Sequence, residues 1–142
     1  MTAGLVSDDM AQASGSSFAV RAEATPAKVA ETRNRLRDWA IENKVDAQTV
    51  NDMVLATYEA LANVVEHAYG GRTGVFLVRA LAHRDQLIVR VQDSGCWTTP
   101  KRATNGLRGR GIELMKALAQ QIDVRGAETG TEIELRWSTA DV

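Results

Sequence analysis

The sequence predicts an α+β protein: a two-layer sandwich in which a mixed, mostly antiparallel sheet is covered on one face by about three helices. Two observations carry this prediction. Segments that alternate apolar and polar residues, as half-buried strands do, occur near both ends and in the middle of the chain. Between them lie stretches whose apolar residues recur at the three- to four-residue spacing of an amphipathic helix.

The length and composition are those of a single small domain. The 142 residues suffice for one core, with residues 1–16 as a flexible, small and polar tail and residues 17–142 as the domain. A formal net charge of −1 argues against a global field that would recruit nucleic acid or an anionic membrane. The single cysteine, Cys96, cannot form an intramolecular disulfide. No segment approaches the roughly 18 apolar residues of a membrane helix, and the N-terminus lacks an export signal, so the expected compartment is the cytoplasm.

The N-terminal part of the domain contains one predicted strand and two predicted helices. Apolar and polar residues alternate over residues 17–21, which predicts the strand. Thr25 followed by a proline favours a helix start, and that helix is expected to end near Asn43. Asp46 is the expected N-cap of the second helix, which two glycines end after Tyr69. The large apolar residues of this second helix fall on one stripe: Val50, Met53, Val54, Leu61, Val64, Val65 and Ala68.

A hairpin and a long loop follow. Residues 74–82 and 86–93 are rich in β-branched and apolar residues and flank a short polar turn, which predicts two antiparallel strands. Residues 94–108 have no clear periodicity and are expected to form a long loop, the kind that in small domains is usually functional or mobile.

The C-terminal part contains one more helix and the end of the sheet. The helix is expected to begin around Gly109 and to carry an apolar stripe that reaches Ile122. Residues 123–125 and 131–137 flank a glycine-containing turn and are expected to form strands.

Glu59 and Asn63 form the first candidate functional pair. They lie one helical turn apart and therefore share one face of the second helix. Helical-wheel arithmetic places that face opposite the stripe of large apolar residues. The commoner interpretation of such a pair is a solvated polar face. The functional interpretation is a carboxylate and an amide that project into a cleft, one as a base and the other as a ligand for a metal or a phosphate.

Two further motifs stand where predicted strands end or begin. Asp93 closes the strand 86–93 and is followed by Ser94 and Gly95. Such an acid either starts a turn or, with the glycine clearing the backbone, accepts a hydrogen bond from a flat ligand. Gly130-Thr131 opens the last strand and by itself indicates no more than a turn.

A glycine-flanked helix start supplies the fourth motif. The backbone N–H groups around Gly109 and Gly111 and the positive end of the helix dipole suit a phosphate. Basic residues add local positive charge: Lys101, Arg102, Arg108 and Arg110. The alternative is a solvated basic loop. The sequence contains no P-loop, no Rossmann fingerprint and no paired metal-binding histidines.

The order of these four motifs resembles the Bergerat-fold (GHKL) ATPases and, within that superfamily, the RsbW-type anti-sigma factor serine/threonine kinases. The motifs that carry the resemblance are Glu59-Ala-Leu-Ala-Asn63-Val-Val-Glu-His67-Ala-Tyr69, Val91-Gln-Asp93-Ser-Gly95, Gly109-Arg-Gly111-Ile and Gly130-Thr131. The similarity runs from about Phe18 to Trp137. Because of this resemblance, the functional interpretation of Glu59 and Asn63 is favoured over that of a solvated polar face.

The resemblance implies a role for each residue in the first two motifs. Asn63 would coordinate Mg²⁺ bound to the phosphates of ATP, and Glu59 would be the general base that accepts the proton of a substrate serine. Asp93 would bind the amino group of adenine, with support from Thr131 and clearance from Gly95.

The resemblance also implies how the phosphates are reached. Residues 94–108 would form a lid over ATP. Gly109 and Gly111 would let the backbone approach the phosphates, and either Arg108 or Arg110 would steady the transferring phosphoryl group.

The implied cofactors are ATP and Mg²⁺, and the implied assembly is a homodimer. Two protein partners follow from the resemblance: an RNA polymerase sigma factor that is held inactive, and an anti-anti-sigma (STAS-domain) protein that is released once its serine is phosphorylated. We expect no direct contact with nucleic acid and none with a membrane. A non-catalytic module that binds nucleotide and sequesters a partner is the main alternative. A fragment of a sensor histidine kinase is a weaker one, because only a short tail, one strand and one helix precede the Glu59 helix.

Overall fold

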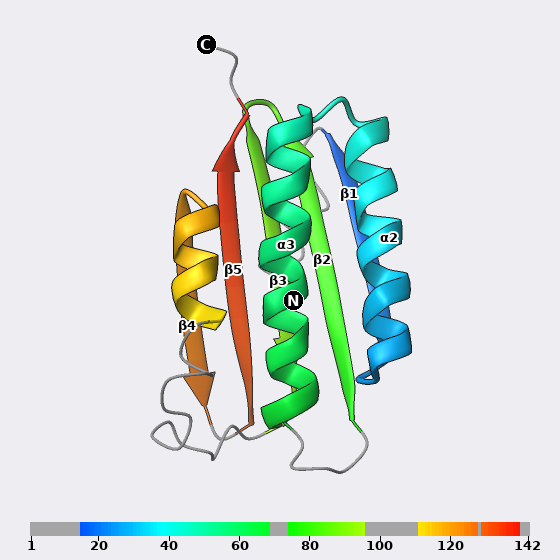
Figure 1. The fold of residues 1–142 in the computed structure, drawn as a ribbon, viewed down its shortest axis with the longest axis vertical. Coiled ribbons are helices and arrows are strands. Elements are labelled where there is room, and N and C mark those ends of the chain that lie inside the picture. The colour runs from blue at the N-terminus through cyan, green and yellow to red at the C-terminus, as the bar shows by residue number, and fades with distance from the viewer. Residues whose placement is uncertain (1–14, 69–73, 96–110, 128, 140–142) are drawn as a thin grey trace.

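Five strands form one antiparallel sheet in the computed structural model, which describes residues 15–68, 74–95, 111–127 and 129–139. The strand order is β1-β2-β3-β5-β4, and every neighbouring pair is antiparallel. The strands are β1 (Ser16–Glu23), β2 (Val75–His83), β3 (Gln86–Asp93), β4 (Gln121–Ala127) and β5 (Gly130–Ser138). Figure 1 shows helices on one face of this sheet. The predicted α+β two-layer sandwich is confirmed, and the described strands contain no parallel pair.

Alternation along the strands separates the two faces of the sheet. Val89 and Val91 of β3 are buried and lie opposite Leu135 and Ile133 of β5. The residues between them face the other way, because successive side chains of a strand point to opposite faces. The predicted bounds of β3 match the observed ones, and β1, β4 and β5 are longer than predicted.

Two of the helices, α2 and α3, begin at the caps that the sequence predicts. The helices are α2 (Pro26–Glu42), α3 (Ala47–Asn63) and an unlabelled helix over residues 111–118. The Thr25 side chain accepts a hydrogen bond from the Lys28 N–H at 3.2 Å. Asp46 accepts one from the Thr49 hydroxyl at 2.7 Å and one from the Thr49 N–H at 3.1 Å. These two bonds hold the pKa of Asp46 below its ordinary value.

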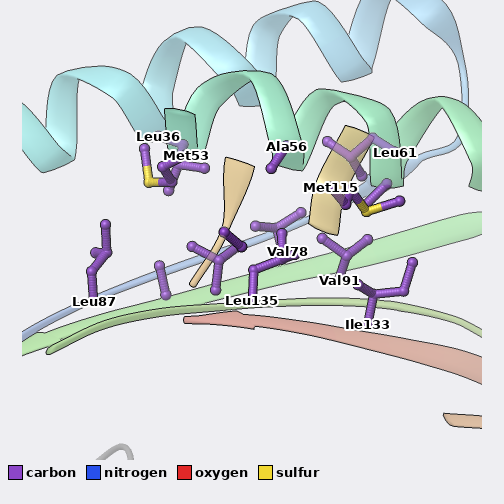
Figure 2. Packing of buried hydrophobic residues seen from close by; sticks show 14 of the residues in the cluster. Leu36, Met53, Ala56, Leu61, Val78, Leu87, Val91, Met115, Ile133 and Leu135 are labelled. Carbon is purple, nitrogen blue, oxygen red and sulfur yellow. The ribbon is translucent and has the colours of Figure 1, made fainter. Parts of the chain in front are cut away.

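The hydrophobic core lies between the helices and the sheet. Its largest fully buried side chains include Leu36, Met53, Leu61 and Met115 from the helices and Phe76, Leu87, Ile133 and Leu135 from the strands. Figure 2 shows Met53 toward the Leu87 end of the sheet, and Leu61 with Met115 above Val91 and Ile133. Each end of α3 therefore lies over a different end of β3.

In the described ranges, no helix is long and apolar enough to cross a membrane.

Two helix ends differ from the prediction. The third helix stops at residue 118, and Ile122 lies in β4 opposite Leu135 rather than on a helical stripe. Ile122 fits a helical stripe and a strand alternation equally well, and pairing with β5 decides in favour of the strand. The α-helical part of α3 ends at Asn63, and the chain continues as a π-helical segment, Val64–Ala68.

The turn between β4 and β5 provides a stability test. Gly130 has a φ of 151°, which side-chain-bearing residues rarely adopt, and a Cβ there would overlap the carbonyl oxygen of Asp93. Gly130→Ala should therefore lower the free energy of unfolding by roughly 2–4 kcal/mol, measured by urea denaturation.

Gly126 is the matched control, since it belongs to the same pair of strands. A Cβ there would meet only the Thr131 Oγ1, at 3.9 Å. Gly126→Ala should change the free energy of unfolding by no more than about 0.5 kcal/mol. Equal losses in the two variants would contradict the tight approach of Gly130 to β3.

Candidate functional site

Asn63 is buried at the C-terminal end of α3, where the helical wheel predicted a face turned away from the core. Its exposure is 7%, and Glu59, one turn earlier, is half-buried. The prediction is wrong because it considered only large apolar residues. Ala56 and Ala60 are fully buried, whereas Val54, counted in the stripe, is only half-buried. Because these small alanines are buried as well, the buried face of α3 extends to Asn63.

The third helix begins against this pair of side chains. A Cβ on Gly111 would lie 3.3 Å from both the Nδ2 and the Oδ1 of Asn63, and 3.5 Å from the Oε1 of Glu59. The absence of a side chain at Gly111 therefore keeps open the space beside an amide and a carboxylate. Gly111, far away in the sequence, thus meets the predicted pair Glu59 and Asn63 at this point.

The other predicted phosphate-side residues lie outside the described ranges. They are Arg108, Gly109 and Arg110, and the same holds for residues 96–107 of the predicted lid. Their roles stay predictions.

Asp93 and Thr131 form a second group, at the end of β3 and the start of β5. They lie directly opposite each other in the strand register, and each is 8% exposed. Both are in phase with the core residues Val91 and Ile133, so their side chains point to the helix-covered face. The Oδ1 of Asp93 accepts a hydrogen bond from the Gly95 N–H at 2.9 Å. A carboxylate can accept further donors through its remaining lone pairs.

Gly130 contributes to this second group in a way that the sequence did not reveal. Its backbone lies against the carbonyl group of Asp93, so closely that no side chain fits between them. In the sequence, the only sign of this contact is a glycine directly before Thr131. From sequence alone, that glycine is indistinguishable from the glycine of an ordinary turn. Its structural consequence is that β5 begins in contact with the end of β3.

The two groups occupy the same end of the sheet. Figure 2 shows Leu61 and Met115 over Val91 and Ile133. Asn63 follows Leu61 by two residues, and Asp93 follows Val91 by two residues. The carboxyl end of α3, the start of the third helix and the paired ends of β3 and β5 therefore converge.

The residues present fit a magnesium–nucleotide complex. The amide oxygen of Asn63 is a hard oxygen donor of the kind that Mg²⁺ prefers, and Mg²⁺ usually takes one or two protein ligands together with phosphate oxygens. The helix start at Gly111 presents backbone N–H groups and a positive dipole end to an anion. Within the described ranges, no group of three or more His, Cys, Asp or Glu residues could hold a metal ion.

Solved structures with the same fold include one of RsbU and RsbW domains and several of histidine kinases. The structure of the RsbU and RsbW domains of Rv1364c from Mycobacterium tuberculosis matches 89% of this chain with a TM-score of 0.70 and 24% sequence identity. The histidine kinase domain of the Erythrobacter litoralis EL346 blue-light activated histidine kinase matches 65% of it, with a TM-score of 0.51 and 25% identity. This chain spans only 33% and 45% of the lengths of those two chains.

The Acinetobacter baumannii histidine kinase AdeS matches 99% of this chain with a TM-score of 0.51, at 11% identity. These likenesses establish the fold. The family itself is established by the sequence, because residues 22–137 match the model of the histidine kinase-like ATPase domain. The chain belongs to the histidine kinase-like ATPase family.

Proposed function

We propose that this protein is an ATP-dependent serine/threonine kinase that acts as an anti-sigma factor. It binds Mg-ATP, sequesters an RNA polymerase sigma factor, and phosphorylates a serine of an anti-anti-sigma partner with a STAS domain. The observation that carries the proposal is the convergence of Glu59, Asn63 and Gly111 with the buried pair Asp93 and Thr131. Membership of the ATPase family and the fold shared with the RsbW-containing structure support it.

Nucleotide recognition would rest on the strand ends. The buried carboxylate of Asp93 is an acceptor suited to the exocyclic amino group of adenine, and burial excludes the water that would compete for it. The Gly95 N–H bond holds that carboxylate in place. Thr131, directly opposite, would complete the contact with the base through its hydroxyl.

The phosphates would lie toward α3 and the third helix. Asn63 would hold Mg²⁺ through its amide oxygen, and Gly111 gives the phosphates clearance beside that amide. Bound Mg²⁺ would supply charge neutralisation and orientation of the phosphates. By the same family resemblance, Gly109 and one of Arg108 and Arg110 would contact the phosphates from the lid side.

Glu59 would act on the substrate hydroxyl. It lies one turn before Asn63 and next to Gly111, and hence beside the place proposed for the phosphates. A carboxylate in this position can accept the serine proton as the oxygen attacks. Proton removal by a positioned base contributes roughly 10²–10⁴ in rate.

The proposed partners are proteins rather than nucleic acid or lipid. A sigma factor and a STAS-domain protein would bind a homodimer in the cytoplasm. The near-neutral net charge of −1 is consistent with protein partners. The non-catalytic module remains the competing proposal, and it differs in one observable: it transfers no phosphate.

The adenine contact can be tested by a change of one atom. Asp93→Asn should weaken ATP binding roughly 10- to 100-fold, because it removes a charge-assisted hydrogen bond worth about 1.5–3 kcal/mol. Isothermal titration calorimetry with ATP and Mg²⁺ measures this loss. Asp85→Asn, an exposed turn residue at the far end of β3, is the matched control and should leave the affinity unchanged. An unaltered affinity in Asp93→Asn would refute the adenine assignment.

Substitution of the proposed base, Glu59, should affect phosphoryl transfer and not ATP binding. Glu59→Gln should lower phosphoryl transfer from radiolabelled ATP to the cognate STAS protein by roughly 10²–10⁴, with little change in ATP affinity. The same substitution at Glu42, an exposed residue at the end of α2, should leave transfer intact. Normal transfer by Glu59→Gln overturns the base assignment, and an inactive parent protein overturns the kinase proposal in favour of the binding module.

A further inference from the structure

A cavity lies at the opposite end of the fold from the proposed nucleotide site. Its volume is about 740 Å³, within the range of small-molecule sites. The residues that line it come from the start of β1, the α2–α3 connection, the β2–β3 turn and the end of β5: Gly15, Ser16, Asn43, Lys44, Val45, Asp46, Ala82, Arg84, Gln86, Ser138 and Thr139.

The strand directions fix the separation of the two sites. β3 runs from Gln86 in the cavity to Asp93 in the nucleotide site, and β5 runs from Thr131 back to Ser138. At roughly 3.4 Å per residue, the two ends of β3 lie about 24 Å apart. In Figure 1 the α2–α3 connection and the β2–β3 turn lie together at the upper end of the sheet. The cavity is thus not part of the nucleotide site.

Two cations on the cavity wall have an unusual backbone conformation. Lys44 has a φ of 64° and Arg84 a φ of 55°. Among the residues that the structure describes, these are the only non-glycine residues with a positive φ, and both line this one cavity. Glycine or asparagine adopts this conformation more readily, so turn geometry alone does not account for a lysine and an arginine there.

The charges around the cavity favour an anion. Lys44 and Arg84 form no ion pair with any residue in the described ranges. The carboxylate in the wall, Asp46, accepts two hydrogen bonds from Thr49. That carboxylate also caps the N-terminus of α3 and offsets its dipole, so Lys44 and Arg84 supply the positive charge of the wall.

The rest of the wall is polar in a way that suits a hydroxylated ligand. Ser16, Ser138 and Thr139 line it with hydroxyl-bearing side chains. Asn43 and Gln86 add amides, one bonded to the Trp39 carbonyl and the other to Arg136, which leave their remaining donors and acceptors for a ligand. The Ser16 oxygen accepts a hydrogen bond from the Trp39 indole at 2.9 Å, which ties this part of the wall to α2. The cavity is also much larger than a single inorganic anion requires.

We propose that this cavity binds a small phosphorylated sugar, with its phosphate group held by Lys44 and Arg84 and its hydroxyl groups against the polar wall. The site is independent of the proposed kinase activity, because it shares no residue with the nucleotide site. Two cations on separate loops provide the charge-assisted hydrogen bonds that a phosphate prefers.

The test uses ribose 5-phosphate as the probe, with free ribose and inorganic phosphate as separate arms. In a titration followed by ¹H–¹⁵N NMR, the amide signals of Val45, Gln86 and Thr139 should shift saturably, and those of Gly95 and Thr131 should not follow them. Ribose 5-phosphate should bind more tightly than either fragment. Three results would each overturn the proposal. Inorganic phosphate alone could bind more tightly than ribose 5-phosphate, the shifts could be confined to Gly95 and Thr131, or no signal could shift saturably.

Charge-removing variants separate binding from folding. Lys44→Asn and Arg84→Asn introduce asparagine, which tolerates a positive φ, so the unfolding temperature of both variants should be no lower than that of the parent protein. Each should weaken the binding of ribose 5-phosphate roughly three- to tenfold, as removal of one exposed cation does. Lys116→Gln, an exposed cation on the third helix, is the control and should bind normally. Unchanged affinity in both Asn variants, or an equal loss in Lys116→Gln, would contradict the site. Lys44→Gly and Arg84→Gly provide a second pair with the same expected loss.

Discussion

The close packing of α3 against the sheet is the constraint on which the rest of the structure depends. Ala56 and Ala60 of this helix are fully buried in the core that helices and sheet share, as are Met53 and Leu61. Because the small side chains bring the helix near the strands, they also fix its rotation about its own axis. That rotation buries Asn63 at the end of the helix and leaves Glu59 half-buried beside it. A helix rotated to bury only its large apolar residues would turn both groups toward solvent.

The candidate nucleotide site uses the ends of elements whose middles form the core. Leu61, Val91 and Ile133 are buried, and the polar residues Asn63, Asp93 and Thr131 follow or precede them by two positions. The packed apolar residues hold the neighbouring polar side chains in place. The carboxylates and the amide therefore need little reorganisation to bind a ligand. The change to a π-helical segment directly after Asn63 places an irregular turn at this same end, as is frequent at functional sites.

The sequence predicted the elements with strong local signals and missed what depends on contacts between distant segments. The caps at Thr25 and Asp46 and the bounds of β3 follow from neighbouring residues, and the structure confirms them. The burial of Asn63 depends on alanines that carry little hydrophobic signal, and Ile122 satisfies two periodicities at once. Gly130 resembles any turn glycine until β3 is placed beside it. The distal cavity draws on four separate segments, which no spacing along the chain relates.

We propose that the end of α3, the end of β3 and the start of β5 together form one nucleotide site. A crystal structure of the protein with Mg²⁺ and a non-hydrolysable ATP analogue tests it most directly. We expect the adenine amino group to lie on the Asp93 carboxylate, the metal on the Asn63 amide oxygen, and a phosphate beside Gly111. A nucleotide bound at another place, or one that contacts the strand ends but not α3, would contradict it.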